Sequence, residues 1–431
     1  MRKDWINCKL GDILKLKNGY AFKSNLYLNK GVPVIRIGDI NKWLVDSKNA
    51  KCVLGNSEYD DYIVEKGDIL IAMSGATTGK FGIYQSNDKA YQNQRVGNLK
   101  PFSKDFPIKK FIFFLLYSLK REIEKSAYGG AQPNISASKI ESLKIALPPL
   151  PEQRAIVQKI EQLFTNLDKG IENLKTAQEQ LKVYRQAVLK KAFEGIDTTI
   201  SLIECGDWKG GGTPSRQKKE YWEGGTIPWV SSRDVKTKEI HDTERHITEL
   251  AIPNSSTKWI EKDALLFVMR SGILRRIFPI AIAKVKLCVN QDIHTLSLRE
   301  DFFSEYVYWF LVGNESTIRH NCSKDGTTVE SIDSNKLKAF KVPLCSLEEQ
   351  HQIVQEIESR LSVTDKMEES IKESLIKAEA LRQSILKKAF EGALLTDAEL
   401  DACRLEKDYE SAEKLLKRIK DENRNTKKRK K

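Results

Sequence analysis

The stretch Leu189-Lys-Lys-Ala-Phe-Glu-Gly195 returns unchanged as Leu386-Lys-Lys-Ala-Phe-Glu-Gly392. Around it, residues 140–195 align with 337–392 at a constant offset of 197 positions, without a gap and with 23 identities in 56 positions. Such an internal repeat constrains the architecture before any single residue does. The chain of 431 residues is therefore a tandem duplication, and a single small domain is excluded.

The repeat continues upstream in a weaker form. At offsets of 195 to 197 positions the matches are Pro33 with Pro228, Asp39 with Asp234, Glu65-Lys66 with Glu261-Lys262, and Asn93-Gln94 with Asn290-Gln291. Each half thus combines a divergent globular stretch with a better preserved segment. We expect the boundaries 1–145, 146–195, 196–342, 343–392 and, for a charged tail, 393–431.

The two preserved segments have the apolar periodicity of long helices. Leucine, isoleucine and valine recur every seven residues in the first and less regularly in the second, where Arg360, Thr364 and Ser374 interrupt the pattern. An apolar stripe of that length must be buried, so we expect the helices to form an antiparallel, coiled-coil-like pair that separates the globular regions. The predicted packing positions are Ile160, Leu167, Leu174, Leu181, Val188, Ile357, Ile371, Leu381 and Ile385.

Start and stop signals frame both helices. The prolines at 148, 149 and 151 precede the first, and Ser346-Leu-Glu-Glu349 has the form of a capping box before the second. Gly195 and Gly392 supply a residue that tolerates the left-handed conformation at a helix end.

The globular stretches have the pattern of mixed α/β domains. Short β-branched runs between turn residues predict strands at 32–37, 69–73 and 96–99, and at 227–230, 264–268 and 280–285. Apolar runs at 109–125 and 305–312 predict helices. The predicted fold class is α+β, or mixed α/β, in a tandem pseudo-two-fold repeat of two globular domains and two long paired helices.

Composition limits the classes of function. The formal net charge is +13, and residues 1–151 carry +10 of it whereas residues 195–346 carry +1, which favours a polyanionic partner. The seven cysteines are scattered without a C-x-x-C pair, so we expect them to be reduced and packed. The longest apolar run, 111–117, is too short to cross a membrane, so we expect a cytoplasmic protein without a membrane partner.

Catalytic and metal-binding patterns are largely missing. All five histidines follow residue 240, so imidazole chemistry cannot be common to both halves, and neither H-E-x-x-H nor G-x-G-x-x-G occurs. Ser74-Gly-Ala-Thr-Thr-Gly-Lys80 resembles a phosphate-binding loop but lacks its first glycine and the hydroxyl that holds magnesium. A plain surface turn and a loop that contacts a nucleic-acid backbone are both better interpretations. We predict no catalytic residue and no metal site in this chain.

The helix-flanking motifs carry a resemblance to a known family. Ala146-Leu-Pro-Pro-Leu-Pro-Glu-Gln153 and Pro343-Leu-Cys-Ser-Leu-Glu-Glu-Gln350 precede the helices, and the repeated Lys-Lys-Ala-Phe-Glu-Gly follows each of them. With Gly211-Gly-Thr-Pro-Ser215 and Ile227-Pro-Trp-Val230 in the second half, the chain resembles the specificity subunit of a type I restriction-modification system. Ala146, Cys345 and Ser346 depart from the family pattern at the helix entries.

The resemblance implies a non-catalytic subunit that binds double-stranded DNA. Its two globular regions would be target recognition domains, each reading one half of a bipartite target, and its helices would dock two methyltransferase subunits. Those partners would bind S-adenosylmethionine, no cofactor would be bound by this chain, and restriction subunits with translocase and nuclease activity could join the complex.

Candidate DNA contacts are donors and amides at matched places in both halves. Arginine reads guanine, asparagine or glutamine reads adenine, and lysine or serine holds phosphates. The predicted contacts are Ser74, Thr77, Thr78, Lys80, Asn93, Gln94, Arg95, Thr213, Ser215, Arg216, Ser231, Ser232, Arg233, Arg270, Arg275, Arg276, Asn290 and Gln291.

Two other classes of function stay open. One is a stand-alone sequence-specific or architectural DNA-binding protein with a coiled-coil spacer, and the other is an independent DNA-modifying enzyme, against which the missing motifs count. For the tail, a capped helix from Thr396 and a basic end predict either a solvated terminus or a site for a partner or phosphates.

Overall fold

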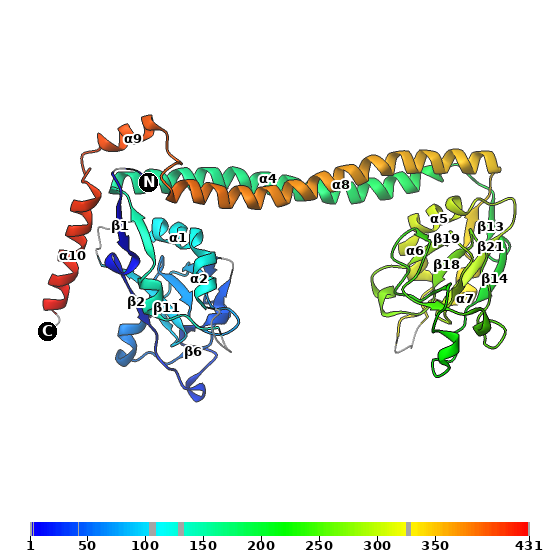
Figure 1. Ribbon diagram of the computed structural model, residues 1–431, viewed down its shortest axis with the longest axis horizontal. Coiled ribbons are helices and arrows are strands. Elements are labelled where there is room, and N and C mark those ends of the chain that lie inside the picture. Colours follow the sequence, from blue (N-terminus) through cyan, green and yellow to red (C-terminus); the bar gives the residue numbers. More distant parts are fainter. Residues whose placement is uncertain are drawn as a thin grey trace. The chain divides into compact units, whose positions relative to one another are not determined.

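The computed structural model describes residues 2, 4–41, 43–102, 109–127, 133–324 and 329–429. The chain divides into unit 1, residues 1–173 with 374–431, and unit 2, residues 174–373. Each unit contains one globular domain together with one end of each long helix, α4 (Leu150–Ala192) and α8 (Leu347–Phe390) (Figure 1).

Unit 1 is built on a six-stranded sheet of order β2-β11-β8-β9-β5-β4 and a four-stranded sheet of order β6-β3-β10-β7, while β1 pairs with β12. Its strands are β1 (Ile6–Lys9), β2 (Leu14–Asn18), β3 (Val32–Ile35), β4 (Ile40–Asn41), β5 (Trp43–Val45), β6 (Cys52–Val53), β7 (Ile63–Val64), β8 (Ile69–Ala72), β9 (Phe81–Tyr84), β10 (Ala90–Gln92), β11 (Val96–Pro101) and β12 (Lys144–Leu147). Its helices are η1 (Leu10–Asp12), η2 (Ser24–Leu26), η3 (Ile37–Asp39), η4 (Ser57–Tyr62), α1 (Lys109–Ser118), α2 (Lys120–Ala127), α3 (Ala137–Glu141), α9 (Asp397–Arg404) and α10 (Ala412–Arg429).

Unit 2 is built on a five-stranded sheet of order β14-β21-β18-β19-β16 and a three-stranded sheet of order β17-β15-β20, while β13 pairs with β22. Its strands are β13 (Thr199–Ser201), β14 (Gly206–Gly210), β15 (Ile227–Val230), β16 (Glu239–Ile240), β17 (His246–Ile247), β18 (Leu265–Val268), β19 (Ile280–Ala283), β20 (Cys288–Val289), β21 (Ile293–Leu298) and β22 (Lys341–Pro343). Its helices are η5 (Lys219–Tyr221), η6 (Glu249–Ala251), η7 (Gly272–Arg275), α5 (Ser304–Gly313), α6 (Glu315–Asn321) and α7 (Ser334–Lys338).

The two units repeat one topology, which confirms the predicted duplication and the mixed α/β class. The order β2-β11-β8-β9-β5 of unit 1 returns as β14-β21-β18-β19-β16, and β6-β3-β10 returns as β17-β15-β20. The predicted strands are present as β3, β8, β11, β15, β18 and β19. The helix predicted for 109–125 is interrupted at Leu119 and forms α1 and α2, whereas α5 is continuous over the stretch predicted in the second half.

The long helices pair in opposite directions within each unit. In unit 1 the Arg382 guanidinium forms an ion pair with Asp168, and in unit 2 Arg185 forms one with Asp365. These residues correspond at the offset of 197 positions, so the two ion pairs are copies of each other. The internal repeat of the sequence is therefore also present in the contacts between the two helices.

Burial along the helices follows the predicted seven-residue pattern at most positions. Ile160, Val188, Ile357, Ile371 and Ile385 are buried, and Leu167, Leu174 and Leu181 are half-buried. Leu381 departs from the pattern because it is 52% exposed, and Ala378, at 8%, takes the buried position. Thr364 does not interrupt the seam, because it is 1% exposed and its hydroxyl donates to the Arg360 carbonyl (3.1 Å).

The predicted helix ends are confirmed at the glycines and at the capping box, but Pro151 does not precede α4. It is the second residue of the helix, in the first turn, where a proline is tolerated because the backbone N–H there has no acceptor within the helix. Gly195 and Gly392 have φ angles of +86° and +80°. Ser346 and Glu349 form the reciprocal hydrogen bonds of a capping box.

The tail is folded against unit 1. Thr396 caps α9 as predicted, and the second helix, α10, lies beside the N-terminal segment (Figure 1). Leu415, Leu416 and Ile419 enter the core of unit 1, and Lys420 forms an ion pair with Asp12 (3.1 Å). The tail is therefore packed on unit 1 as far as Ile419, whereas the side chains of the basic end, 427–431, lie outside the described residues.

Candidate nucleic-acid interface

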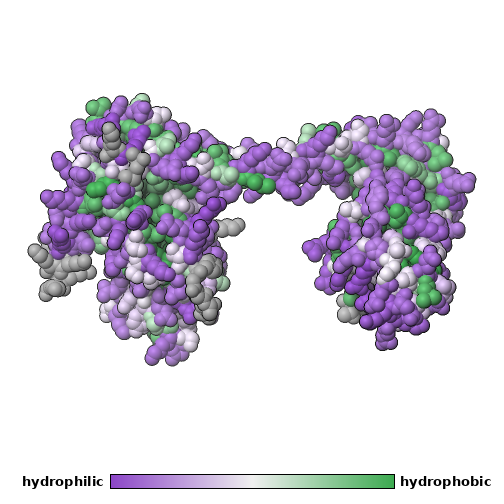
Figure 2. Space-filling model, in the orientation of Figure 1, coloured by the Kyte–Doolittle hydropathy of each residue, from purple (hydrophilic) through white to green (hydrophobic). Residues whose placement is uncertain are grey.

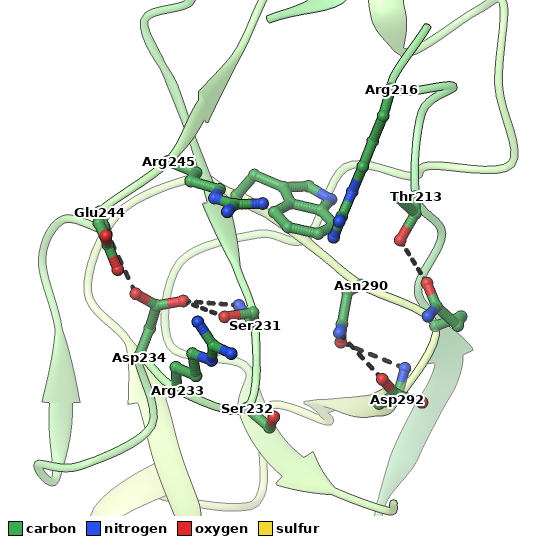
Figure 3. A pocket seen from close by; sticks show the side chains of 12 residues that line it. Thr213, Arg216, Ser231, Ser232, Arg233, Asp234, Glu244, Arg245, Asn290 and Asp292 are labelled. Carbon is green, nitrogen blue, oxygen red and sulfur yellow. Dashed lines mark hydrogen bonds between the residues drawn. The ribbon is translucent and has the colours of Figure 1, made fainter. Parts of the chain in front are cut away.

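A polar pocket of about 230 Å³ opens in unit 2 near the ends of β15 and β20 (Figure 3). Its walls come from the segment after β14, the turn after β15, the turn before β17 and the loop between β20 and β21. The lining residues are Thr213, Arg216, Trp229, Ser231, Ser232, Arg233, Asp234, Glu244, Arg245, Asn290, Gln291 and Asp292. Seven of them are predicted DNA contacts, so the fold brings together residues that lie up to 78 positions apart in the sequence.

Backbone and indole hydrogen bonds hold the walls of this pocket. The indole of the buried Trp229 donates to the Gly212 carbonyl (3.0 Å), and the Asn290 N–H donates to the Val230 carbonyl (2.9 Å). A Cβ on Gly211 would collide with the Asn290 carbonyl, so a glycine is required where these segments meet. The recognition surface is therefore shaped by a rigid frame rather than by its side chains alone.

Amide side chains in the pocket are oriented by neighbours. The Thr213 hydroxyl donates to the Gln291 side-chain oxygen, and the Asn290 amide donates to the Asp292 carboxylate (3.3 Å) (Figure 3). Oriented amides can present defined donors and acceptors to a base edge.

Three arginines surround the pocket and remain available. Arg216, Arg233 and Arg245 come from three segments and extend toward the same space (Figure 3). All three are exposed, and none has a side-chain hydrogen bond or ion pair with another residue in the described part of the chain. Unpaired guanidinium groups suit phosphate oxygens and guanine edges.

The turn after β18 holds the remaining arginines predicted in unit 2. Arg275 forms an ion pair with Glu330 (2.6 Å), whereas Arg270 and Arg276 are exposed and have no side-chain partner among the described residues. Ser215, the last predicted contact of this unit, is exposed and lies beside the pocket residue Arg216.

Unit 1 has a more open polar pocket of about 420 Å³ at the matching turn. Three predicted contacts, Ser74, Gln94 and Arg95, line it. Next to them in sequence, Asn93 donates from its amide to the hydroxyl of Tyr27 (3.3 Å). The remaining lining residues are Asn18, Met73, Asn134, Ile135, Ser136 and Ala137.

The loop 74–80 is a tight turn in which the side chains have different roles. Thr78 is buried, and its hydroxyl donates to the carbonyls of Gly75 (2.6 Å) and Pro133 (3.0 Å), so it anchors the turn. The Thr77 hydroxyl is buried without a partner, and Lys80 is exposed with none in the described residues. Of these predicted contacts, Lys80 is the best placed to reach a phosphate.

Several residues of the interface escaped the sequence analysis. Glu244 and Arg245 lie in a segment without identical counterparts in the first half, and Arg36 occupies the position that corresponds to Ser231. The Arg36 guanidinium lies over the Tyr27 ring, 5.9 Å from its centroid. A search restricted to matched residue types cannot find such positions, because they differ between the halves.

Side-chain chemistry elsewhere gives no sign of catalysis. The described residues contain no group of three or more histidine, cysteine or acidic residues that could hold a metal ion. All seven cysteines are free thiols, and burial raises the pKa of Cys205 and Cys288 to about 12, far from that of a nucleophilic thiolate. No helix in the described ranges is long and apolar enough to cross a membrane.

Two α/β domains of the same topology, each with a recess that contains predicted contacts, define a duplicated protein with two related surfaces. On the side seen in Figure 2, the surface of both domains is mainly hydrophilic. A family model described as "Type I restriction modification DNA specificity domain" matches residues 2–180 and again 198–377. The chain therefore belongs to the family of type I restriction-modification specificity subunits, and its globular domains are two target recognition domains, TRD1 in unit 1 and TRD2 in unit 2.

Individual relatives agree with this assignment. The EcoR124I/EcoR124II specificity subunit of Escherichia coli is 33% identical over 279 residues, which cover 64% of this chain and 67% of the relative. The EcoBI specificity subunit of Escherichia coli is 25% identical and covers 97% of this chain and 92% of its own length.

Solved structures share the fold. The HsdS subunit of Thermoanaerobacter tengcongensis aligns with a TM-score of 0.61 and 19% identity, over 91% of this chain and 98% of that one. A chain from a study of complex assembly and conformational transition of the type I R-M system aligns with a TM-score of 0.73 and 19% identity, over 91% and 99%.

Proposed function

We propose that this chain selects the DNA sequence on which a type I restriction-modification complex acts. TRD1 and TRD2 each read one part of a bipartite double-stranded target, and neither domain performs chemistry. The observation that carries the proposal is the match of both halves to the specificity-domain family, combined with the arginine-lined pocket of TRD2.

The long helices have a second role in this proposal. They dock two methyltransferase subunits, which bind S-adenosylmethionine and modify adenine, and their length sets the gap between the half-sites. Restriction subunits join the same complex, and the assembly works in the cytoplasm. The reciprocal Arg382–Asp168 and Arg185–Asp365 ion pairs support two equivalent docking places, because each unit contains a copy of the same contact between the helices.

The test is a genome-wide map of N6-methyladenine in the source strain with this gene intact and deleted. We expect the deletion to abolish one bipartite motif, which would also identify both half-sites. A map that does not change would contradict the proposal. The stand-alone alternative requires tight, sequence-specific DNA binding by the purified chain without any partner, which a binding assay at several salt concentrations would detect.

A further inference from the structure

The TRD2 pocket mixes charges of both signs. Beside its three unpaired arginines lie the carboxylates of Asp234, Glu244 and Asp292. A phosphate site would exclude carboxylates, because like charges repel in a recess of reduced dielectric. The mixture suits a base edge instead, where hydrogen-bond donors and acceptors alternate.

Two of the three carboxylates are already engaged. Asp234 accepts hydrogen bonds from the N–H (2.8 Å) and the hydroxyl (2.7 Å) of Ser231, and Asp292 accepts one from the Asn290 amide. The carboxylate of Glu244 is exposed and has no partner among the described residues. It is therefore the acceptor that the pocket leaves free.

The next residue, Arg245, is an equally free donor on the same wall. Its carbonyl accepts hydrogen bonds from the Trp229 N–H (3.0 Å) and the Thr243 hydroxyl (2.6 Å). The Glu244 N–H approaches the Asp234 carboxylate (3.4 Å). The backbone of this turn is thus fixed to β15 while both side chains stay available to a ligand.

We infer that TRD2 reads a G·C base pair through this turn, with Arg245 donating to guanine O6 and N7 and Glu244 accepting from the cytosine amino group. This inference rests on the proposed function. Only a G·C pair offers two adjacent acceptors and a donor in the major groove, whereas an A·T pair would leave one arginine donor facing the adenine amino group.

At the corresponding place, TRD1 lacks the side chains that would contact a G·C pair in this way. The Val34 N–H donates to the Lys51 carbonyl (2.8 Å) just as the Trp229 N–H donates to the Arg245 carbonyl, so Lys51 corresponds to Arg245 and Ala50 to Glu244. Alanine offers no acceptor for the cytosine amino group. The paired acceptor and donor of this turn are therefore present in TRD2 and absent from the corresponding place in TRD1.

The test uses the complete complex of this chain with its methyltransferase subunits in cells, with the N6-methyladenine motif as the readout. In Glu244→Ala we expect one G·C position of one half-site to become degenerate, with discrimination there reduced roughly tenfold. Arg245→Gln should retain binding but lose the preference for guanine at the same position, because a glutamine side chain pairs one donor with one acceptor, which is the pattern of adenine. The other half-site should not change in either variant.

A matched control is Glu249→Ala, since Glu249 is an exposed acid on η6 that does not line the pocket. Its motif should equal that of the wild type. An unchanged motif in Glu244→Ala, or an unchanged motif in Arg245→Gln, would overturn the inference while leaving the proposed function intact. A wild-type complex without any bipartite motif would instead refute the proposed function.

Discussion

TRD1 and TRD2 share a backbone but differ in their recognition side chains. In both domains the methionine that follows strand β8 or β18 is hydrogen bonded to the same loop: the Met73 N–H donates to the Arg95 carbonyl, and the Met269 N–H donates to the Asp292 carbonyl, each at 2.8 Å. The backbone frame is therefore common to both domains, while the position of Arg95 in TRD1 is occupied by Asp292 in TRD2. Specificity can diverge in this family fold without any change in its hydrogen-bonded skeleton.

The two domains also differ in their net charge. Residues 1–151 carry a net charge of +10 and residues 195–346 carry +1. Phosphate contacts supply affinity that depends on salt, and base-edge contacts supply discrimination. We therefore expect TRD1 to contribute more of the salt-dependent affinity and the mixed pocket of TRD2 more of the discrimination per contact.

Removing residues 393–431 should have the largest effect and should be confined to unit 1. The truncation takes Leu395, Leu400, Leu415, Leu416 and Ile419 out of the core. Each buried side chain of this kind contributes roughly 1.5–3 kcal/mol, so the loss is comparable with the stability of a whole domain. Hydrogen exchange should show lost protection in α1 and retained protection in α5. Equal protection of both helices would show that the tail is dispensable.

The glutamines at the starts of the long helices should give the next largest difference. The buried Gln350 accepts from the Phe303 N–H (2.8 Å) and donates to the carbonyls of Asp301 (2.9 Å) and Cys345 (3.0 Å). The buried Gln153 donates only to the Pro148 carbonyl (2.8 Å), and its side-chain oxygen has no partner.

Gln350→Leu removes three partly buried hydrogen bonds and should therefore destabilise unit 2 by about 2 kcal/mol. Gln153→Leu removes one bond together with one unpaired oxygen, so its cost to unit 1 should stay below about 1 kcal/mol. Urea unfolding followed by hydrogen exchange in α5 and α1 measures both. Equal losses would mean that the two helix starts are energetically equivalent.

The architecture could be predicted because signals in the sequence determine it. The repeat is visible when the two halves are compared, and the seven-residue periodicity and the glycine caps are readable from neighbouring residues. The helices end where the glycines place them, although α4 begins at Leu150, one residue before Pro151. The candidate site was found only in part. Glu244 and Arg245 lie together at the pocket because backbone hydrogen bonds fix their turn to β15. Ala378 is buried in place of Leu381 because of the face that the partner helix covers. Both features depend on tertiary contacts.

Lys80 offers a smaller test of the difference in charge between the two domains. The Ala72 N–H donates to the Lys80 carbonyl (2.7 Å), and at the corresponding place in TRD2 the Val268 N–H approaches the Pro279 carbonyl (3.2 Å), so TRD2 has no equivalent cation. Lys80→Ala should weaken binding to cognate and unrelated duplexes alike and reduce the salt slope by about one unit.

Fluorescence titrations of the complete complex at several salt concentrations measure that slope. Lys175→Ala removes an exposed lysine from α4 and should leave the slope unchanged. If Lys80→Ala also left it unchanged, Lys80 would not contact a phosphate.

Glu152 and Glu349 occupy the same position in the repeated motif at the start of each long helix. Their substitution should have the smallest effect, and the pH dependence of stability should change in opposite directions in the two variants. Burial raises the pKa of Glu152, although a hydrogen bond from the Trp5 indole (2.8 Å) opposes the shift. A hydrogen bond from the Ser346 hydroxyl (2.7 Å) lowers the pKa of the exposed Glu349. A raised carboxyl pKa means that the folded state binds the proton more tightly, so the contribution of Glu152 becomes less favourable as pH rises through that pKa.

The contribution of Glu349 is present above its unfolded pKa and is lost as pH falls through its lowered folded value. Raising the pH from about 4 to 7 should therefore move the thermal midpoint of Glu152→Gln upward relative to wild type and that of Glu349→Gln downward. Glutamine keeps an oxygen for the Trp5 indole, so the first comparison isolates the charge. Midpoints that moved in the same direction for both variants would show that one position of the family motif has the same electrostatic environment in the two halves.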